Sequence, residues 1–154
     1  MKSVLISIQK PHTDNIFNCR KLVEWRKKPL PLLKHYVYES KKNGGCGKVI
    51  GEMEIVRNVP VDIDTVSNAL LDIGCVDKDF LLKYCNGNGN VLYANSIANV
   101  KIYDKPKELS EFLKPCNKNG NCMYCGKHPN DGGKCTGRIV RPPQSWYYVE
   151  DLGE

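Results

Sequence analysis

The chain has 154 residues, of which 41% are hydrophobic and 26% are charged, the size and composition of one globular domain that can bury its own core. It has no run of about 18 apolar residues, and the interrupted alternation at 1–9 does not fit a signal peptide, so we expect a cytoplasmic protein without a membrane partner. The net charge of +6 is concentrated in residues 1–48, which hold 11 Lys or Arg against 3 Asp or Glu, so this third either attracts a polyanion or is a solvated basic surface.

The first part of the chain predicts short strands and one short helix. Apolar residues alternate over 4–9, as in a largely buried strand, and Pro11 suits the first turn of a helix over 12–18. Further strands are expected at 22–26, 36–38 and 48–56. Asn43-Gly44-Gly45 is a strong turn signal before the last of these strands.

The second part predicts two helices followed by more strands. Helices are expected at 61–71 and 77–85, and Asp77 is a suitable N-cap for the second. The remaining expected elements are strands at 91–97, 100–103 and 146–149 and one helical turn within 106–112. Short strands with few helices and no regular βαβ alternation favour an antiparallel or mixed barrel over a doubly wound sheet. We therefore predict an α+β, mainly β fold, a mixed β-barrel with a few flanking helices.

We predict a single domain over 1–154, with a distinct insert at 114–138. This insert is rich in Gly, Asn, Lys and Cys and has few aliphatic side chains, so it needs a staple other than a hydrophobic core. Four of the eight cysteines of the chain fall within it: Cys116, Cys122, Cys125 and Cys135. The other four are scattered, and we expect them to be inert, buried residues.

The central piece of the insert has the spacing of a metal site. Two thiolates two residues apart, Cys122 and Cys125, can grip one tetrahedral metal ion from a tight turn, and Gly126 lets the backbone aim N–H groups at sulfur. We predict that the four cysteines hold one structural Zn²⁺. The open alternatives are a redox Cys-x-x-Cys pair, disulfides, and a site in which His128 replaces one cysteine as a ligand.

The residues around the first helix resemble those of the ASCH family, a branch of the PUA-like superfamily. ASCH proteins open with a strand, a Pro-started helix and a Gly-x-Lys-x-x-Glu/Thr-x-Arg motif, with Cys19 standing here where Gly is usual. In this sequence the motif reads Cys19-Arg20-Lys21-Leu22-Val23-Glu24-Trp25-Arg26. The segments 103–109 and 141–146 are similar to a phage- and Firmicutes-type subgroup that carries a Cys-rich insert between them.

The resemblance implies a pseudo-barrel with a cleft beside the first helix, lined by the basic and polar residues of the motif. We expect Lys21, Glu24 and Arg26 there, with Arg26 fixing the Glu24 carboxylate and lowering its pKa. The expected ligand-binding set also includes Gln9, Lys10, Ser145 and Trp146. Aromatic side chains either stack on bases or pack in the core; these are Trp25, Tyr36, Tyr38, Trp146 and Tyr147.

The expected function is binding of RNA or a nucleotide-like ligand, without catalysis. Some small ASCH proteins remove the acetyl group from acetylated cytidine with a Lys, a Thr and a Glu, so an amidohydrolase acting on acylated nucleosides is the first alternative. Its candidate catalytic residues are Lys21, Glu24 and Glu52, and Glu24 stands where that arrangement has Thr. The second alternative is a protein-interaction adaptor that uses the zinc loop as its contact surface.

Overall fold

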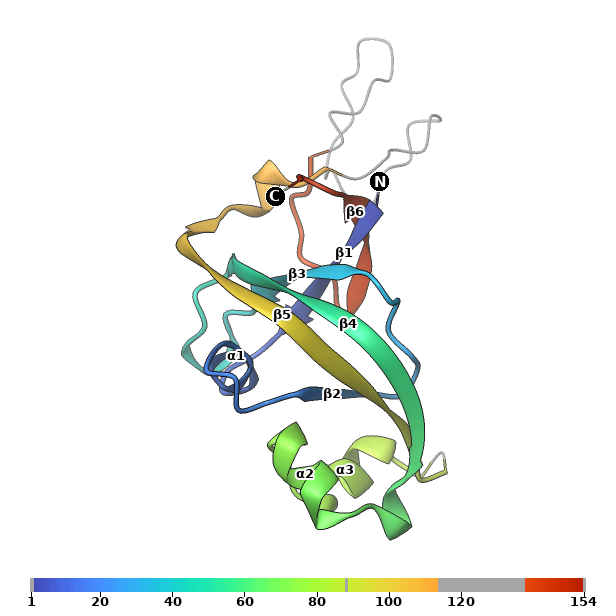
Figure 1. Ribbon diagram of the computed structural model, residues 1–154. Coiled ribbons are helices and arrows are strands. Elements are labelled where there is room, and N and C mark those ends of the chain that lie inside the picture. The colour runs from blue at the N-terminus through green and yellow to red at the C-terminus, as the bar shows by residue number, and fades with distance from the viewer. Residues whose placement is uncertain (1, 88, 114–137, 154) are drawn as a thin grey trace. The chain divides into compact units, whose positions relative to one another are not determined.

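The computed structural model describes residues 2–87, 89–113 and 138–153 (Figure 1). The four cysteines predicted to bind zinc, together with His128, lie outside these ranges. The described chain divides into two compact units, one made of residues 1–10, 35–52 and 102–154 and the other of residues 11–34 and 53–101. In the described part of the chain, no helix has the length and apolar composition that crossing a bilayer requires.

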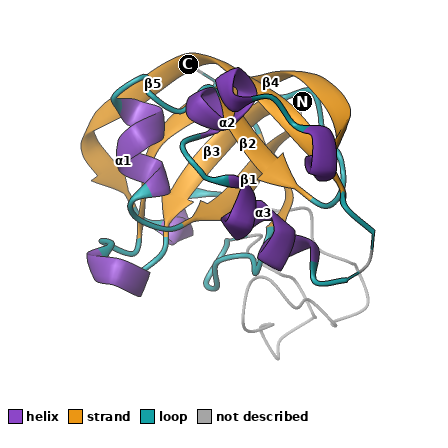
Figure 2. Cartoon of the chain, turned by 90° about the horizontal axis from the view of Figure 1, so that it is seen from below, coloured by secondary structure: helices purple, strands orange, loops and turns teal. Residues whose placement is uncertain are grey.

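The strands form one mixed sheet with the order β2-β5-β4-β3-β1-β6. Its two long strands, β4 (Lys48–Asp62) and β5 (Val91–Lys107), each have residues in both units. The predicted α+β, mainly β class is confirmed, and Figure 2 shows strands as the main regular structure with only short helices. Within the described residues, however, the strand order is linear, with β2 and β6 at its edges, so the sheet is open where we expected a closed barrel.

The first unit is built around β1 (Lys2–Ile8), which pairs in parallel with β3 (Lys34–Glu39) and antiparallel with β6 (Trp146–Glu150). The alternating apolar residues of β1 explain its central place, because side chains on both of its faces are buried. Its core is a hydrophobic cluster with residues from these three strands, from β4 and from the segments on either side of residues 114–137. The cluster consists of Leu5, Tyr36, Tyr38, Val49, Phe112, Ile139 and Val149.

The second unit carries the α-helices. It contains α1 (His12–Phe17), β2 (Val23–Arg26), α2 (Asn68–Gly74) and α3 (Lys78–Cys85). Asp77 caps α3 as predicted, since its Oδ1 accepts the Phe80 N–H at 2.7 Å. The core of this unit joins β2, β5 and the helices: Val23, Trp25, Ile63, Leu71, Leu81, Cys85, Leu92 and Ala94.

Three predicted elements differ from those observed. The helix expected at 61–71 is wrong in its first half, because the β-branched residues there extend β4 to Asp62 and α2 begins only after Ser67, whose side chain accepts the Leu70 N–H. The two strands expected at 91–97 and 100–103 are one strand, in which Asn99 has a left-handed φ of 51°. The helical turn expected at 106–112 is a 3₁₀ turn over Leu109–Glu111.

Candidate functional site

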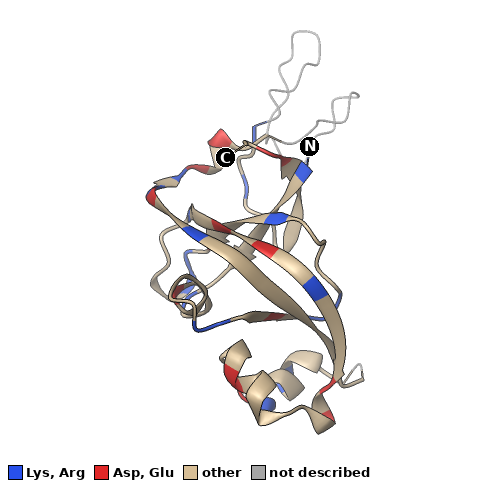
Figure 3. Cartoon of the chain, in the orientation of Figure 1, with Lys and Arg blue, Asp and Glu red and all other residues tan. Residues whose placement is uncertain are grey.

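The structure brings the three motif residues Lys21, Glu24 and Arg26 together at β2 in the second unit. Figure 3 shows β2 with an acidic residue in the strand and basic residues at its ends. The other residues predicted to form the site belong to the first unit: Gln9, Lys10, Glu52, Ser145 and Trp146.

A left-handed turn after α1 directs the chain into the motif. Cys19 has φ 59°, the conformation for which glycine is favoured, and it occupies the motif position where Gly is usual. The carbonyl oxygen of Asn15 accepts the N–H groups of both Arg20 and Lys21 at 2.9 Å. These bonds close the end of the helix and fix where the Lys21 side chain starts.

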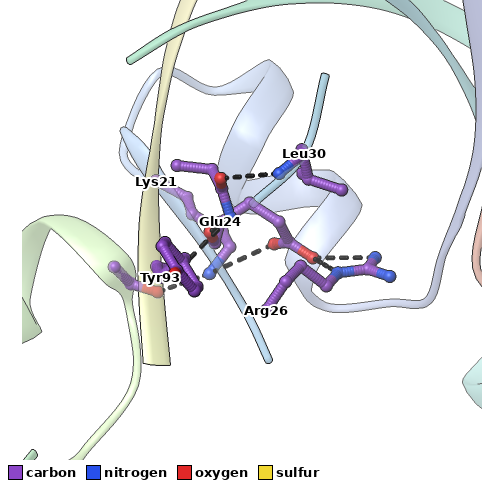
Figure 4. Close-up of polar contacts among 7 residues, drawn as sticks. Lys21, Glu24, Arg26, Leu30 and Tyr93 are labelled. Carbon is purple, nitrogen blue, oxygen red and sulfur yellow. Dashed lines mark hydrogen bonds and ion pairs between the residues drawn. The ribbon is translucent and has the colours of Figure 1, made fainter. Parts of the chain in front are cut away.

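Lys21 is buried, with 2% of its surface exposed. Its Nζ donates a hydrogen bond of 2.6 Å to the carbonyl oxygen of Gly74 and lies 3.6 Å from Oε1 of Glu24 (Figure 4). Gly74 is the last residue of α2, where unpaired carbonyls and the helix dipole favour a cation. The ammonium group therefore ties β2 to α2 rather than facing solvent.

Glu24 is buried between two cations. Its Oε2 lies 3.0 Å from both Nε and Nη2 of Arg26, while its Oε1 faces Lys21. Burial favours the neutral acid, but the charges of Arg26 and Lys21 outweigh it and hold the pKa of Glu24 below its ordinary value. The carboxylate is thus ionised at neutral pH and orients the Arg26 guanidinium, which is half-buried at the last residue of β2.

Asn95 is a fully buried residue of β5 that sequence reasoning missed. Its Oδ1 accepts hydrogen bonds from Leu30 N–H at 3.0 Å and from Nδ2 of Asn58 at 2.6 Å, and its Nδ2 donates to the Glu24 carbonyl at 3.0 Å. It lies opposite Glu24 in the β2–β5 register. Asn95 therefore joins β2, β5 and the loop after β2 behind the charged cluster.

Two further titratable residues lie near the Glu24 cluster. Burial and the positive charge of Lys21 lower the pKa of His12, which keeps its imidazole neutral at pH 7. Burial raises the pKa of Tyr84 on α3, and the Lys27 ammonium lies 5.3 Å from the centre of its ring. Neither residue belongs to the motif. The only local sequence signal for His12 is its position directly after Pro11.

The candidates of the first unit have partners of their own. Nζ of Lys10 lies 3.5 Å from Oε2 of the buried Glu39. The Glu52 carboxylate accepts a hydrogen bond of 2.9 Å from the Tyr103 hydroxyl, whose pKa is raised by burial and by this carboxylate. Gln9 is exposed. Glu52 thus has a described role in a Tyr–Glu pair of its own unit.

The last two candidates lie at the start of β6. The Ser145 carbonyl accepts the Ser7 N–H at 2.9 Å. Trp146 is half-buried and packs edge-to-face on Tyr148, with ring centroids 5.2 Å apart. Aromatic surface is therefore available at this strand, because Tyr148 is 37% exposed.

Three of the aromatic residues considered for base stacking pack in the cores. Trp25, Tyr36 and Tyr38 expose 6%, 1% and 5% of their surfaces. Of the two roles considered for these side chains, base stacking and core packing, the structure shows core packing. The indole of Trp25 packs so closely on Gly74 that a Cβ at Gly74 would collide with Nε1 of Trp25. The scattered cysteines also differ from expectation, since Cys19 and Cys46 are exposed and only Cys85 is buried.

Comparison with known proteins identifies the fold. No family model matches the chain, and no curated protein matches it. Among solved structures, the ASCH protein of Zymomonas mobilis superposes with a TM-score of 0.67 at 18% identity, over 96% of this chain and 87% of that one. The chain has the ASCH fold. Two point mutants of the same protein superpose equally well, a Tyr-to-Phe mutant over 97% and a Ser-to-Ala mutant over 96% of this chain.

In this chain, the helix after the first strand and the turn at Cys19 bring Lys21 to the last residue of α2. The strand β2 then carries the buried Glu24 and the half-buried Arg26. At 18% identity the likeness establishes the fold, and the chemistry has to be argued from the side chains themselves.

Proposed function

We propose that this chain is an RNA- or nucleotide-binding module of the ASCH family whose ligand contact is centred on Arg26. The observation that carries the proposal is the Arg26 guanidinium itself, which the buried Glu24 holds at the end of β2. The exposed residues Lys27 and Lys28 follow it directly. A fixed guanidinium with two exposed cations beside it suits a phosphate with an attached base or sugar.

The neighbouring aromatic group supports the same proposal. Tyr84 is half-buried and faces the Lys27 ammonium, a pairing of ring and cation that can accept a flat base. The basic excess of residues 1–48 favours a polyanion by long-range attraction. Lys21 contributes as a positioning residue, because its buried ammonium holds Glu24 and α2 rather than reaching a ligand.

The test is binding of a short, labelled single-stranded RNA at low and moderate salt, followed by fluorescence anisotropy. We expect binding that weakens as salt rises, and Arg26→Ala to weaken it by about tenfold. Lys105→Ala is the matched control, since it removes the same charge from an exposed lysine of the first unit. The proposal fails if RNA does not bind at low salt, or if the two variants weaken binding equally.

We further propose that Cys116, Cys122, Cys125 and Cys135 hold one structural zinc ion. Four thiolates close a tetrahedral shell, which leaves no position for a substrate and makes the site a staple for a segment poor in apolar side chains. Metal analysis of untagged protein should find about one zinc per chain. Cys125→Ser should lose the metal, whereas Cys46→Ser, which changes an exposed free thiol, should keep it; protein without zinc or iron would contradict the proposal.

A hydrolase of acylated nucleosides is the second candidate function. The observation in its favour is that His12, Lys21 and Glu24 form a coupled titratable cluster beside α1, an arrangement that is enriched at catalytic sites. Incubation with acetylated cytidine, followed by chromatography for free cytidine, tests it. Turnover that is lost in Glu24→Gln and retained in Glu52→Gln would support it, and absence of free cytidine would exclude this substrate.

A further inference from the structure

A second feature of the second unit is an open pocket at its helices, whose lining does not include Arg26. It has a volume of about 540 Å³, within the range of about 300–1,000 Å³ found for small-molecule sites. Arg26, Lys27 and Lys28 do not line it. The pocket, called here the helical pocket, is lined chiefly by His12, Leu71, Asp72, Val76, Asp77 and Phe80.

The walls of the helical pocket suit a flat ring. The Phe80 side chain is 48% exposed although it is a large apolar group on an ordered helix. Its ring stands at 56° to the His12 imidazole, with centroids 6.1 Å apart, so the two rings form a corner. Leu71 and Val76 add aliphatic surface. A planar ligand can stack on one ring and meet the edge of the other.

The polar groups of the helical pocket are acceptors. Asp72 and Asp77 are both exposed carboxylates. Oδ1 of Asp77 accepts the Phe80 N–H, which leaves Oδ2 available to a ligand. Nζ of Lys78, which follows Asp77 in the chain, donates to the carbonyl oxygen of Asp64. No Lys or Arg lines the pocket among the described residues, so the charged groups nearest to a bound ligand are carboxylates, which favour N–H donors over phosphates.

His12 adds a buried atom that requires a partner. Its Nδ1 is buried and has no hydrogen-bond partner within the described residues. An unsatisfied buried polar atom is rare and destabilising, so hydrogen bonding to it favours a molecule that reaches it from the pocket. The imidazole is neutral at pH 7 because burial and the charge of Lys21 lower its pKa, so it adds no positive charge to the pocket.

We propose that the helical pocket binds a flat heteroaromatic compound that carries ring N–H or amino donors and no negative charge. The ring stacks against Phe80, and its donors face the carboxylates of Asp72 and Asp77. Its lining does not include Arg26, the centre of the proposed RNA contact, and it selects ligands of the opposite charge. It stands or falls independently of RNA binding.

The test uses adenine and AMP as probes, because they share one ring and differ by a phosphate. Each is titrated into the isotope-labelled full-length protein, followed by NMR. We expect saturable shifts at Val76 and Phe80 with adenine, and binding of AMP at least about fivefold weaker because of the two carboxylates. Absence of saturable shifts, or AMP binding as tightly as adenine, overturns the proposal.

Variants assign the binding to this pocket. Phe80→Ala changes an exposed side chain and should weaken adenine binding by about tenfold, and Asp72→Asn should reduce the difference between adenine and AMP. Asp79→Asn removes an equivalent exposed charge from α3 outside the lining and should change neither. Arg26→Ala should leave adenine binding intact. Equal effects of Asp72→Asn and Asp79→Asn, or no effect of Phe80→Ala, would overturn the assignment.

Discussion

Nζ of Lys21 and the carbonyl oxygen of Gly74 lie 2.6 Å apart in the interior of the second unit. This single bond joins the entry of β2 to the last residue of α2. The Lys21 ammonium thus has a structural role, because it holds α2 and also lies beside the buried carboxylate of Glu24. Replacement of Lys21 therefore affects stability before it affects any ligand.

Lys21→Met should lower the free energy of unfolding by about 3 kcal/mol. Breaking a buried ion pair costs about 3–5 kcal/mol, and the lower end applies because Glu24 keeps Arg26 as a partner. Lys27→Met, at an exposed lysine, should change stability by less than about 0.5 kcal/mol. Urea denaturation followed by circular dichroism measures both variants, and equal stabilities would contradict the role given to Lys21.

Asn95→Leu should cost about 2–4 kcal/mol. The leucine has a similar size but cannot form the hydrogen bonds that Asn95 makes with Leu30 N–H, the Asn58 amide and the Glu24 carbonyl. Each buried polar group that loses its partner costs about 1–3 kcal/mol. Asn90→Leu removes a single exposed hydrogen bond to Asp64 and is the matched control. Comparable thermal midpoints for the two variants would rule out Asn95 as a structural node.

Cys19→Gly should stabilise the protein by about 0.5–1 kcal/mol. A non-glycine residue in the left-handed conformation costs about 1–2 kcal/mol, which glycine avoids. The greater conformational entropy of glycine in the unfolded chain offsets part of this stabilisation. Cys19→Ala keeps φ 59° strained and should give no gain. Thermal unfolding of the two variants decides the matter, and a glycine variant no more stable than the alanine variant would disprove the strain.

Stability should fall as pH drops below about 6.5, in part because of His12. Its folded pKa lies below the ordinary value of 6.5, so the unfolded chain takes up the proton first, and the contribution present above pH 6.5 is lost as pH falls through the folded pKa. His12→Gln should flatten this part of the profile. Denaturant midpoints between pH 5 and 8 measure it, and an unchanged slope in His12→Gln would refute the assignment.

Glu24 should produce a second loss of stability at more acidic pH. Its folded pKa is held below the ordinary value of 4.5, so its contribution is complete above that pH and disappears as pH falls through the folded pKa. Glu24→Gln is expected to be less stable at neutral pH and less sensitive to acid. Midpoints measured between pH 5 and 3 test this, and a variant that loses stability as steeply as the parent would argue against it.

Local pattern was enough to predict most strands and the motif cluster. The apolar pattern located β1, β3 and the start of β4, and the motif put Glu24 and Arg26 on the strand observed as β2, with Lys21 at its entry. The extension of β4 to Asp62 was missed because the residues before Ser67 were assigned to the first turns of a helix that begins only after Ser67. The sequence alone could not show that the sheet stays open, since closure depends on which edge strands pair.

The partners of the cluster could not be predicted for a different reason. Gly74 and Asn95 are 53 and 71 residues from the residues they bind in the cluster, Lys21 and Glu24, and no local spacing relates positions so far apart. Burial of Lys21 follows from the same contacts. We expected Lys21 to line a cleft, and the docking of α2 buries it instead.

Because Trp25 packs against Gly74, its intrinsic fluorescence should report on the docking of α2. The indole of Trp25 is buried, and its N–H has no hydrogen-bond partner within the described residues, so its fluorescence emission should lie at short wavelength. Departure of α2 would bring water to that nitrogen and shift the emission to the red. In a Trp146→Phe variant, the emission wavelength of Trp25 alone would report whether α2 is docked, without any added label.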